Sequence, residues 1–141
     1  MAQRVDPYKN FNFRVEIDNV QVAGFSECSG LSSEVSIVEY REGSDHLVRK
    51  LPGQRKFGNI TLKRGITDSR ELYDWHLNIL NGVSDRRSGA IILMDDARND
   101  KVRWRFFEAF PQKYEGPLLN AKGNEVAIET LTLCCERLER E

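Results

Sequence analysis

Apolar and polar residues alternate along the first part of the chain, a pattern that predicts a β-strand with one buried and one wet face. The buried positions of this strand are expected to be Phe11, Phe13, Val15 and Ile17. The polar positions between them are Asn12, Arg14 and Glu16. Asp18 and Asn19 tolerate the left-handed backbone of a tight turn, so we expect the next apolar residues to fold back as a hairpin. Gly24 then interrupts the alternation, which favours a bulge or a bend.

Five later segments also have the alternation or the composition of strands. They are 34–41, 58–64, 89–95, a segment that opens at Val102, and 125–138. Residues 89–95 are almost wholly apolar, as expected for a strand that is buried on both faces. Residues 34–41 carry apolar side chains on both faces, which suggests that this strand is covered on two sides.

The strand that opens at Val102 places Trp104 on its buried face. Its outward positions are Arg103 and Arg105. Pro111 is expected to interrupt this strand, because proline has no N–H for a ladder hydrogen bond. The apolar residues of 125–138 change face along the segment, so we expect the last strand to be bent or bulged.

One segment has the spacing of a helix. The apolar residues along one face of it are Leu72, Trp75 and Ile79. Asp68 and Glu71 fit a capping box at the start, and Asn81 with Gly82 supplies a stop. Full burial of the three apolar side chains contributes roughly 1.5 to 3 kcal/mol each, so we expect the helix to form because it packs on the sheet.

These elements predict a mainly β fold, a small antiparallel β-barrel or sandwich of about seven strands with one flanking α-helix. A length of 141 residues leaves room for one domain, which we expect to span 1–141. The mean hydropathy of -0.54 and the lack of a long apolar run predict no membrane insertion by this chain. The start MAQRVDPYKN has no apolar core behind a basic end, so we expect no signal peptide and cytoplasmic assembly.

Signals for catalysis or for a metal site are weak in this sequence. The cysteines, Cys28, Cys134 and Cys135, lack metal spacing, and adjacent cysteines on a strand point to opposite faces, which favours reduced thiols. Neither histidine has a second ligand at helical spacing. The acidic turn 95–100 lacks the glycine and the distal glutamate of a calcium loop. We therefore expect no cofactor, no metal and no enzymatic activity.

Residues 42–57 lose the alternation and combine glycine, proline and charged side chains. A connection of this length is unusual in a compact domain and often carries function, although a solvated hairpin extension is the plainer alternative. Its charged residues include Glu42, Asp45, Arg49, Lys50, Arg55 and Lys56. The basic residues beside Phe57 also fit a small barrel that binds single-stranded nucleic acid by charge and stacking. With 21 basic and 22 acidic residues, however, the neutral balance of the chain favours a solvated segment.

Six segments, spread over nearly the entire chain, form a specific set when taken in order. They are DPYKNFNFRVEID, VAGFSECSGL, EYREG, RKLPG, FGNITLKRGIT and YEGPLLNAKGNEVAIETL. Together they resemble the tail tube proteins of contractile phages and of phage-tail-like injection systems. A more distant resemblance is to the haemolysin-coregulated ring protein of type VI secretion. The sequence departs from the family pattern at Cys28 and at Cys134 and Cys135, where a small residue and a histidine are commoner.

The resemblance implies a β-barrel with a flanking helix, hexameric rings, and stacking of the rings into a hollow tube inside a contractile sheath. The implied partners are further copies of this chain, a sheath protein, baseplate and tape-measure or cap proteins, and an effector or DNA as cargo in the lumen. The candidate channel-lining residues are Asn12, Arg14, Glu16, Arg103 and Arg105. The charged residues of 42–57 are the candidate contacts to a stacked ring.

The first hypothesis is therefore a structural inner tube subunit of a phage tail or of an injection particle. An adaptor ring that joins the tube to the baseplate is an alternative within the same family. A small barrel that binds single-stranded nucleic acid is the alternative from another class. For an enzyme, the sequence offers no set of residues.

Overall fold

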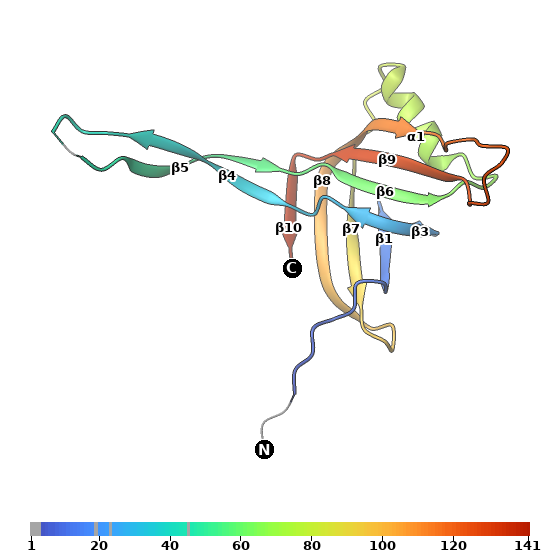
Figure 1. The fold of residues 1–141 in the computed structure, drawn as a ribbon. Helices are drawn as coiled ribbons and strands as arrows, with labels where there is room; N and C mark the ends of the chain where they lie inside the picture. The colour runs from blue at the N-terminus through green and yellow to red at the C-terminus, as the bar shows by residue number, and fades with distance from the viewer. Residues whose placement is uncertain (1–3, 19, 23, 45) are drawn as a thin grey trace.

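The computed structural model describes residues 4–18, 20–22, 24–44 and 46–141 (Figure 1). The strands are β1 (Phe13–Ile17), β2 (Val20–Val22), β3 (Phe25–Ser29), β4 (Ser33–Tyr40), β5 (Arg49–Phe57), β6 (Ile60–Gly65), β7 (Arg87–Met94), β8 (Asp100–Glu115), β9 (Ile128–Cys134) and β10 (Arg137–Arg140). The helix is α1 (Glu71–Leu80). The mainly β, antiparallel architecture with one helix is confirmed within the described residues.

Eight strands form one strongly bent sheet in the order β2-β1-β7-β8-β9-β6-β3, with β10 added to β8. The long strand β8 belongs to both halves of this sheet, because its first part pairs with β7 and β10 and its last part pairs with β9. Figure 1 shows β1, β7 and β10 running across the direction of β6 and β9. The sheet therefore folds over itself like a sandwich and does not close into a barrel.

The opening hairpin is present as predicted. β1 pairs antiparallel with β2, and Asp18 at the turn has a φ of 53°. Asn19, the other predicted turn residue, lies outside the described residues. The bulge predicted near Gly24 appears as a register shift between Phe25 and Glu27 in the pairing of β3 with β6. The alternation in the sequence therefore predicts the opening hairpin and the bulge after it correctly.

The main core lies between the two halves of the sheet and beneath the helix. Its largest fully buried side chains are Trp75, Phe106, Ile60, Leu62, Leu131, Leu133 and Val15. Among the predicted core residues, Val15, Ile17, Leu72 and Trp75 are buried, whereas Phe13, Ile79 and Trp104 are partly buried. Phe11 is 65% exposed, so the prediction of a core position for it is wrong. The reason is that Phe11 precedes β1 and lies on a bend, where the alternation of a strand no longer applies.

The predicted loop 42–57 is for the most part a strand, and it forms a hairpin with the strand before it. β5 pairs with β4 along nearly its whole length, and only residues 41–48 connect the two strands. A bulge interrupts the ladder between Val35 and Ile37, where Ser36 Oγ accepts a hydrogen bond of 2.8 Å from the N–H of Gln54. The hairpin is a separate two-stranded sheet that projects away from the rest of the chain (Figure 1). The prediction that 34–41 is covered on two sides is wrong for the isolated chain, because Ile37 is 63% exposed.

The helix begins at Glu71 without a side-chain cap, so the predicted capping box is wrong. Instead of bonding to the helix N-terminus, Glu71 Oε1 accepts a 2.9 Å hydrogen bond from Arg64 of β6. The predicted stop is present, because Gly82 has a φ of +79° and its N–H donates to the carbonyl of Ile79. Trp75 anchors the helix through an Nε1–H hydrogen bond of 2.8 Å to the carbonyl of Asp85.

Two predictions about the end of the chain have different outcomes. Pro111 does not interrupt its strand: it is buried within β8, and a register shift between Pro111 and Lys113 accommodates the missing N–H. The last segment is bent as predicted, because residues 135–136 separate β9 from β10. This bend returns the chain to β8 and adds β10 to the first half of the sheet.

Candidate functional surfaces

The structure brings four of the five predicted channel-lining residues onto one face of the sheet. They are Arg14, Glu16, Arg103 and Arg105. Across β7, Arg14 and Arg103 both lie opposite Ile92. Glu16 and Arg105 both lie opposite Ala90 in the same way. Because directly opposed residues in an antiparallel ladder share a face, these side chains form one charged surface, which we call the charged face.

Arg14 is the centre of an ion-pair group on the charged face. Its guanidinium binds both carboxylate oxygens of Asp100, with 2.6 Å between Nη2 and Oδ2, and it lies 3.2 Å from Glu16 Oε1. Arg103 Nη2 lies 3.7 Å from the same Asp100 carboxylate. The hydrogen bond to Asp100 raises the pKa of Arg14 and holds the pKa of Asp100 below its ordinary value. Both charges are therefore satisfied within the subunit.

The C-terminal strand extends the charged face with two further pairs. Glu139 lies opposite Arg105 in the ladder between β10 and β8. Arg105 Nε is 2.6 Å from Glu141 Oε1, and Arg137 Nε is 3.2 Å from Glu139 Oε1. Strand β10 and the residue after it thus supply carboxylates to arginines at the edge of the charged face.

A buried apolar strip lies under these charged side chains. It consists of Ala90, Ile92 and Met94 of β7. Next to it, Gly89 allows the close approach of neighbouring strands, since a Cβ there would lie 2.2 Å from the carbonyl oxygen of Glu16 and 2.6 Å from the ring of Phe106. The strip and the close strand packing support the charged side chains from beneath.

Asn12 does not belong to the charged face. Its side chain is only 9% exposed, and Nδ2 lies 3.5 Å from both the carbonyl oxygen of Asp95 and Oδ1 of Asp96. The backbone carbonyl of Asn12 also accepts a hydrogen bond of 2.8 Å from the N–H of Met94. The prediction that Asn12 lines a wet surface is wrong, because this residue ties the start of β1 to the turn after β7.

The predicted ring-stacking residues lie on the hairpin of β4 and β5. The basic ones, Arg49, Lys50, Arg55 and Lys56, are exposed on β5. Two of them face acidic residues across the ladder: Lys50 lies opposite Glu39, and Lys56 lies opposite Glu34. Opposite charges in such pairs attract each other, so the hairpin does not present a continuous basic stripe. Of the acidic residues in the connection, Glu42 is exposed and Asp45 lies outside the described residues.

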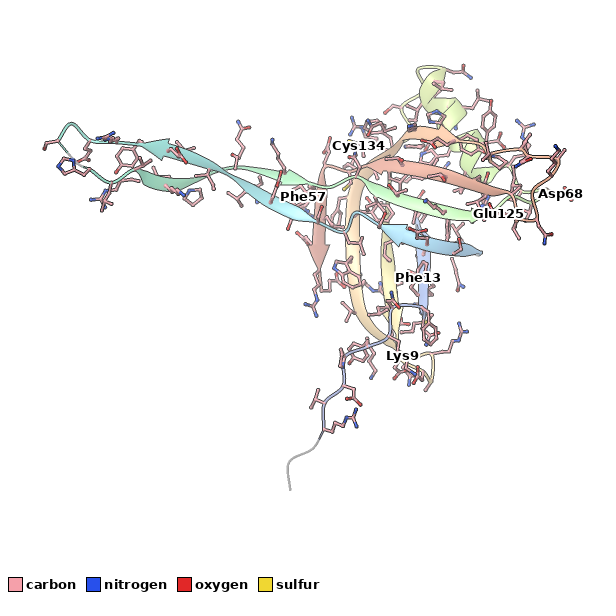
Figure 2. All side chains as sticks on the ribbon, viewed as in Figure 1. Lys9, Phe13, Phe57, Asp68, Glu125 and Cys134 are labelled. Atoms are coloured by element: carbon pink, nitrogen blue, oxygen red, sulfur yellow. The ribbon has the colours of Figure 1, made fainter. Side chains whose placement is uncertain are left out.

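The hairpin also exposes many large apolar side chains. They are Val35, Ile37, Val38, Tyr40, Leu47, Val48 and Leu51. Because successive residues of a strand point to opposite faces, both faces of the hairpin are partly apolar. Figure 2 shows the side chains beyond Phe57 projecting into open space on both sides of the hairpin. A lone two-stranded hairpin is marginally stable in water, and contiguous exposed apolar surface marks an interaction site.

A buried polar network was missed at the level of the sequence. Arg64 Nε lies 2.6 Å from Glu129 Oε1, and the two residues are only 5% and 3% exposed. Tyr114 donates a 2.7 Å hydrogen bond to Glu129 Oε2, and burial together with this bond raises the pKa of Tyr114 to about 12. A signal was present, since Arg64 and Glu129 occupy inward positions two residues from Leu62 and Leu131.

Metal-binding clusters and membrane-spanning helices are both absent from the described residues. No group of three or more His, Cys, Asp or Glu side chains there could hold a metal ion. Each of the three cysteines is a free thiol, and burial raises the pKa of Cys28 to about 12. Within the same residues, no helix has the length and apolar character needed to cross a membrane.

Comparison with known proteins places the chain in a family. The family model of the T4-like virus tail tube protein gp19 matches residues 9–139. A chain of the PVC extracellular contractile injection system, in its extended sheath–tube complex, is 28% identical with a TM-score of 0.84 over 96% of this chain and 91% of that one. A chain of the tube-terminating cap of the anti-feeding prophage is 28% identical with a TM-score of 0.89 over 100% of this chain and 95% of that one.

The resemblance to type VI secretion proteins extends to the fold. Hcp1 from Flavobacterium johnsoniae is 16% identical and has a TM-score of 0.58, over 92% of this chain and 94% of that one. Among curated proteins, no sequence matches this chain at a significant level. Because the family model covers all but the ends of the sequence, the chain belongs to the T4-like tail tube protein (gp19) family.

Proposed function

We propose that this chain is the structural inner tube subunit of a contractile injection system or phage tail, and that it forms stacked hexameric rings around a central channel. The observation that carries this proposal is the match to the tail tube family over residues 9–139. Its structural likeness to a chain of a sheath–tube complex supports the same conclusion. The whole chain, 1–141, acts as a single tube domain, and it carries out no catalysis.

Ring closure has a physical basis in the open edges of the sheet. Strands β2 and β3 end the strand order, and β10 pairs only with β8 among the described residues. Such edges carry backbone groups that can pair with another chain, and a ring of copies satisfies them in a closed assembly. Edge-to-edge pairing that includes β2 and β10 would continue the charged face from one subunit to the next. We assign this face to the channel.

Stacking of rings has its basis in the hairpin of β4 and β5. It projects from the body of the subunit and exposes apolar residues on both faces (Figure 1). A projection that binds a different surface of the next copy forms a head-to-tail contact, which propagates a filament. The charged residues Glu42, Arg49, Lys50, Arg55 and Lys56 would fix the register of this contact.

The proposed partners follow from the same assembly. The tube would assemble in the cytoplasm and then lie inside a sheath, with baseplate, cap and tape-measure proteins at or within its ends. An effector or DNA would pass through the lumen. The related chains belong to a sheath–tube complex and to a tube-terminating cap, which supports a sheath and a cap as partners.

Electron microscopy of the purified protein, alone and with its sheath and baseplate partners, tests the proposal. We expect rings or hollow tubes with a central channel. A protein that stays monomeric at every concentration and never enters such particles would contradict the proposed function.

An adaptor ring at an end of the tube is the second candidate, because a chain of the tube-terminating cap of the anti-feeding prophage is as similar to this chain as a chain of the sheath–tube complex is. Antibody labelling of sheared tubes separates the two functions, since the antibody binds along the whole length if this chain is the tube subunit and at one end if it is an adaptor. Single-stranded nucleic-acid binding is not favoured, because Glu34 and Glu39 oppose two of the four basic residues of β5.

A further inference from the structure

We propose that the channel wall is electrically self-neutralised, so that it does not retain a polyanion although four arginines of each subunit face the lumen. This inference rests on the proposed function, which turns the charged face of β1, β7, β8 and β10 towards the channel. It concerns the chemistry of the wall and the class of cargo that the wall would hold or release.

The eight charged groups that form ion pairs on this face balance within one subunit. The guanidinium groups are those of Arg14, Arg103, Arg105 and Arg137, and the carboxylates are those of Glu16, Asp100, Glu139 and Glu141. In each of the four arginines, a guanidinium nitrogen lies within 4.0 Å of an oxygen of one of the carboxylates. The sum over these eight groups is zero, and any ring of copies repeats that sum.

The pair at the centre of the wall is the hardest one for a phosphate to replace. Arg14 is held by two bonds to Asp100, and its side chain is only 21% exposed. A bidentate guanidinium–carboxylate pair is strong and directional, and partial burial protects it from screening by salt. A phosphate that approached Arg14 would have to displace Asp100 and would then be repelled by the displaced carboxylate.

The ion pairs at the C-terminal end of the chain are more exposed. They neutralise the two arginines at the edge of the charged face. Arg105 with Glu141 and Arg137 with Glu139 have side chains that are about half exposed. Such pairs contribute little to stability, so their carboxylates can be changed without loss of the fold. Loss of these two carboxylates would leave two arginines in each subunit without a partner on the wall.

Retention of nucleic acid depends on cations that are free to replace its counterions. Cations that are already paired release few counterions, so the wild-type wall should bind a polyanion weakly at any salt concentration. A wall with unpaired arginines repeated around a ring should bind it strongly at low salt. The self-neutralised wall therefore fits a conduit that releases a charged cargo rather than a sleeve that stores nucleic acid.

The experiment uses tubes of the full chain and a fluorescent single-stranded oligonucleotide as the polyanion. Co-sedimentation is measured between about 50 and 200 mM salt, the range in which phosphate contacts lose most of their affinity. The test variant combines Glu139→Gln with Glu141→Gln. The control variant combines Asp74→Asn with Glu115→Gln, which removes the same charge from exposed pairs on α1 and at the end of β8. Electron microscopy and circular dichroism establish assembly and folding of each variant.

We expect wild-type and control tubes to leave the oligonucleotide in solution, and test tubes to retain it at least tenfold more at the lower salt concentration. Retention by wild-type tubes, equal retention by the control, or no retention by well-formed test tubes would overturn the inference. If no variant forms tubes, the proposed function fails separately. The same comparison then applies to the unassembled subunit by fluorescence anisotropy, since the ion pairs lie within one chain.

Discussion

At the scale of single residues, the buried pair of Arg64 and Glu129 is expected to have a large effect on stability. Its partners lie on paired strands, and Tyr114 satisfies the second carboxylate oxygen. Removal of Glu129 would leave a buried guanidinium without its main counter-charge. Breaking a buried ion pair in this way costs about 3–5 kcal/mol of stability. We therefore expect Glu129→Leu to lower the free energy of unfolding by about that amount.

Urea denaturation of the unassembled subunit measures this effect. Glu27→Gln is the control, because Glu27 forms an exposed ion pair with Lys63. Such a pair contributes less than about 1 kcal/mol to the free energy of unfolding. The double variant Arg64→Met with Glu129→Leu should recover most of the loss, since it replaces the whole ion pair by apolar groups. Equal midpoints for Glu129→Leu and the control would rule out a structural role for the pair.

Alkaline pH should destabilise the subunit through two partly buried acids. Cys28 and Tyr114 have pKa values near 12 in the folded state, raised chiefly by burial from ordinary values of 9.0 and 10.0. Both groups stay protonated in the folded state while the unfolded chain loses its protons. Their contribution to stability is therefore complete below about pH 9 and is lost as pH rises towards 12.

The free energy of unfolding between pH 8 and 12 measures this loss, which amounts to about 1.4 kcal/mol per pH unit for each titrating group. Cys28→Ala should flatten the slope above pH 9, and Tyr114→Phe should flatten it above pH 10. The slope is the readout, because either substitution also changes packing at every pH. Parallel curves for the wild type and both variants would contradict the assignment.

At the scale of elements, the hairpin of β4 and β5 projects from the rest of the subunit, and we propose that it contacts the next ring. Reversal of its charges at Arg55 and Lys56 should weaken ring stacking before it affects folding. We expect Arg55→Glu with Lys56→Glu to shorten the tubes, while the free energy of unfolding changes by less than about 0.5 kcal/mol, as for other surface substitutions.

Tube length by electron microscopy and urea denaturation are measured together for this variant. The matched control is Arg70→Glu with Lys122→Glu, two exposed charges away from the hairpin. Tubes of wild-type length in the Arg55 and Lys56 variant, or equal shortening in the control, would exclude a role of these charges in stacking.

The hairpin and Pro111 also show where sequence patterns lose their predictive value. The sequence of β5 has no alternation of apolar and polar residues, because neither face of this strand is buried within the subunit. The sequence pattern therefore predicts a loop. Pro111 looked like the end of a strand, but a bulge absorbs its missing N–H inside β8. Where one face is buried and the ladder is regular, as at Val15 and Ile17, alternation predicts the burial correctly.

At the scale of the whole molecule, the bent sheet separates three surfaces that face in different directions. The charged face covers β1, β7, β8 and β10, the helix covers another part of β8, and the hairpin projects away from both (Figure 1). Strand β8 makes this possible, since it pairs with β7 and β10 at one end and with β9 at the other. In the proposed tube, the charged face would line the channel and the hairpin would contact the next ring.

The sequence by itself determined the class of fold, the helix, most of the strands and the resemblance to tail tube proteins. These features depend on local periodicity and on ordered motifs, which a linear chain displays directly. The tertiary structure decided which charges meet, because Arg14 and Asp100, or Arg64 and Glu129, are brought together only by strand pairing and by turns. It also decided that Phe11 is exposed and Asn12 buried, because burial depends on where a strand begins and on what packs beside it.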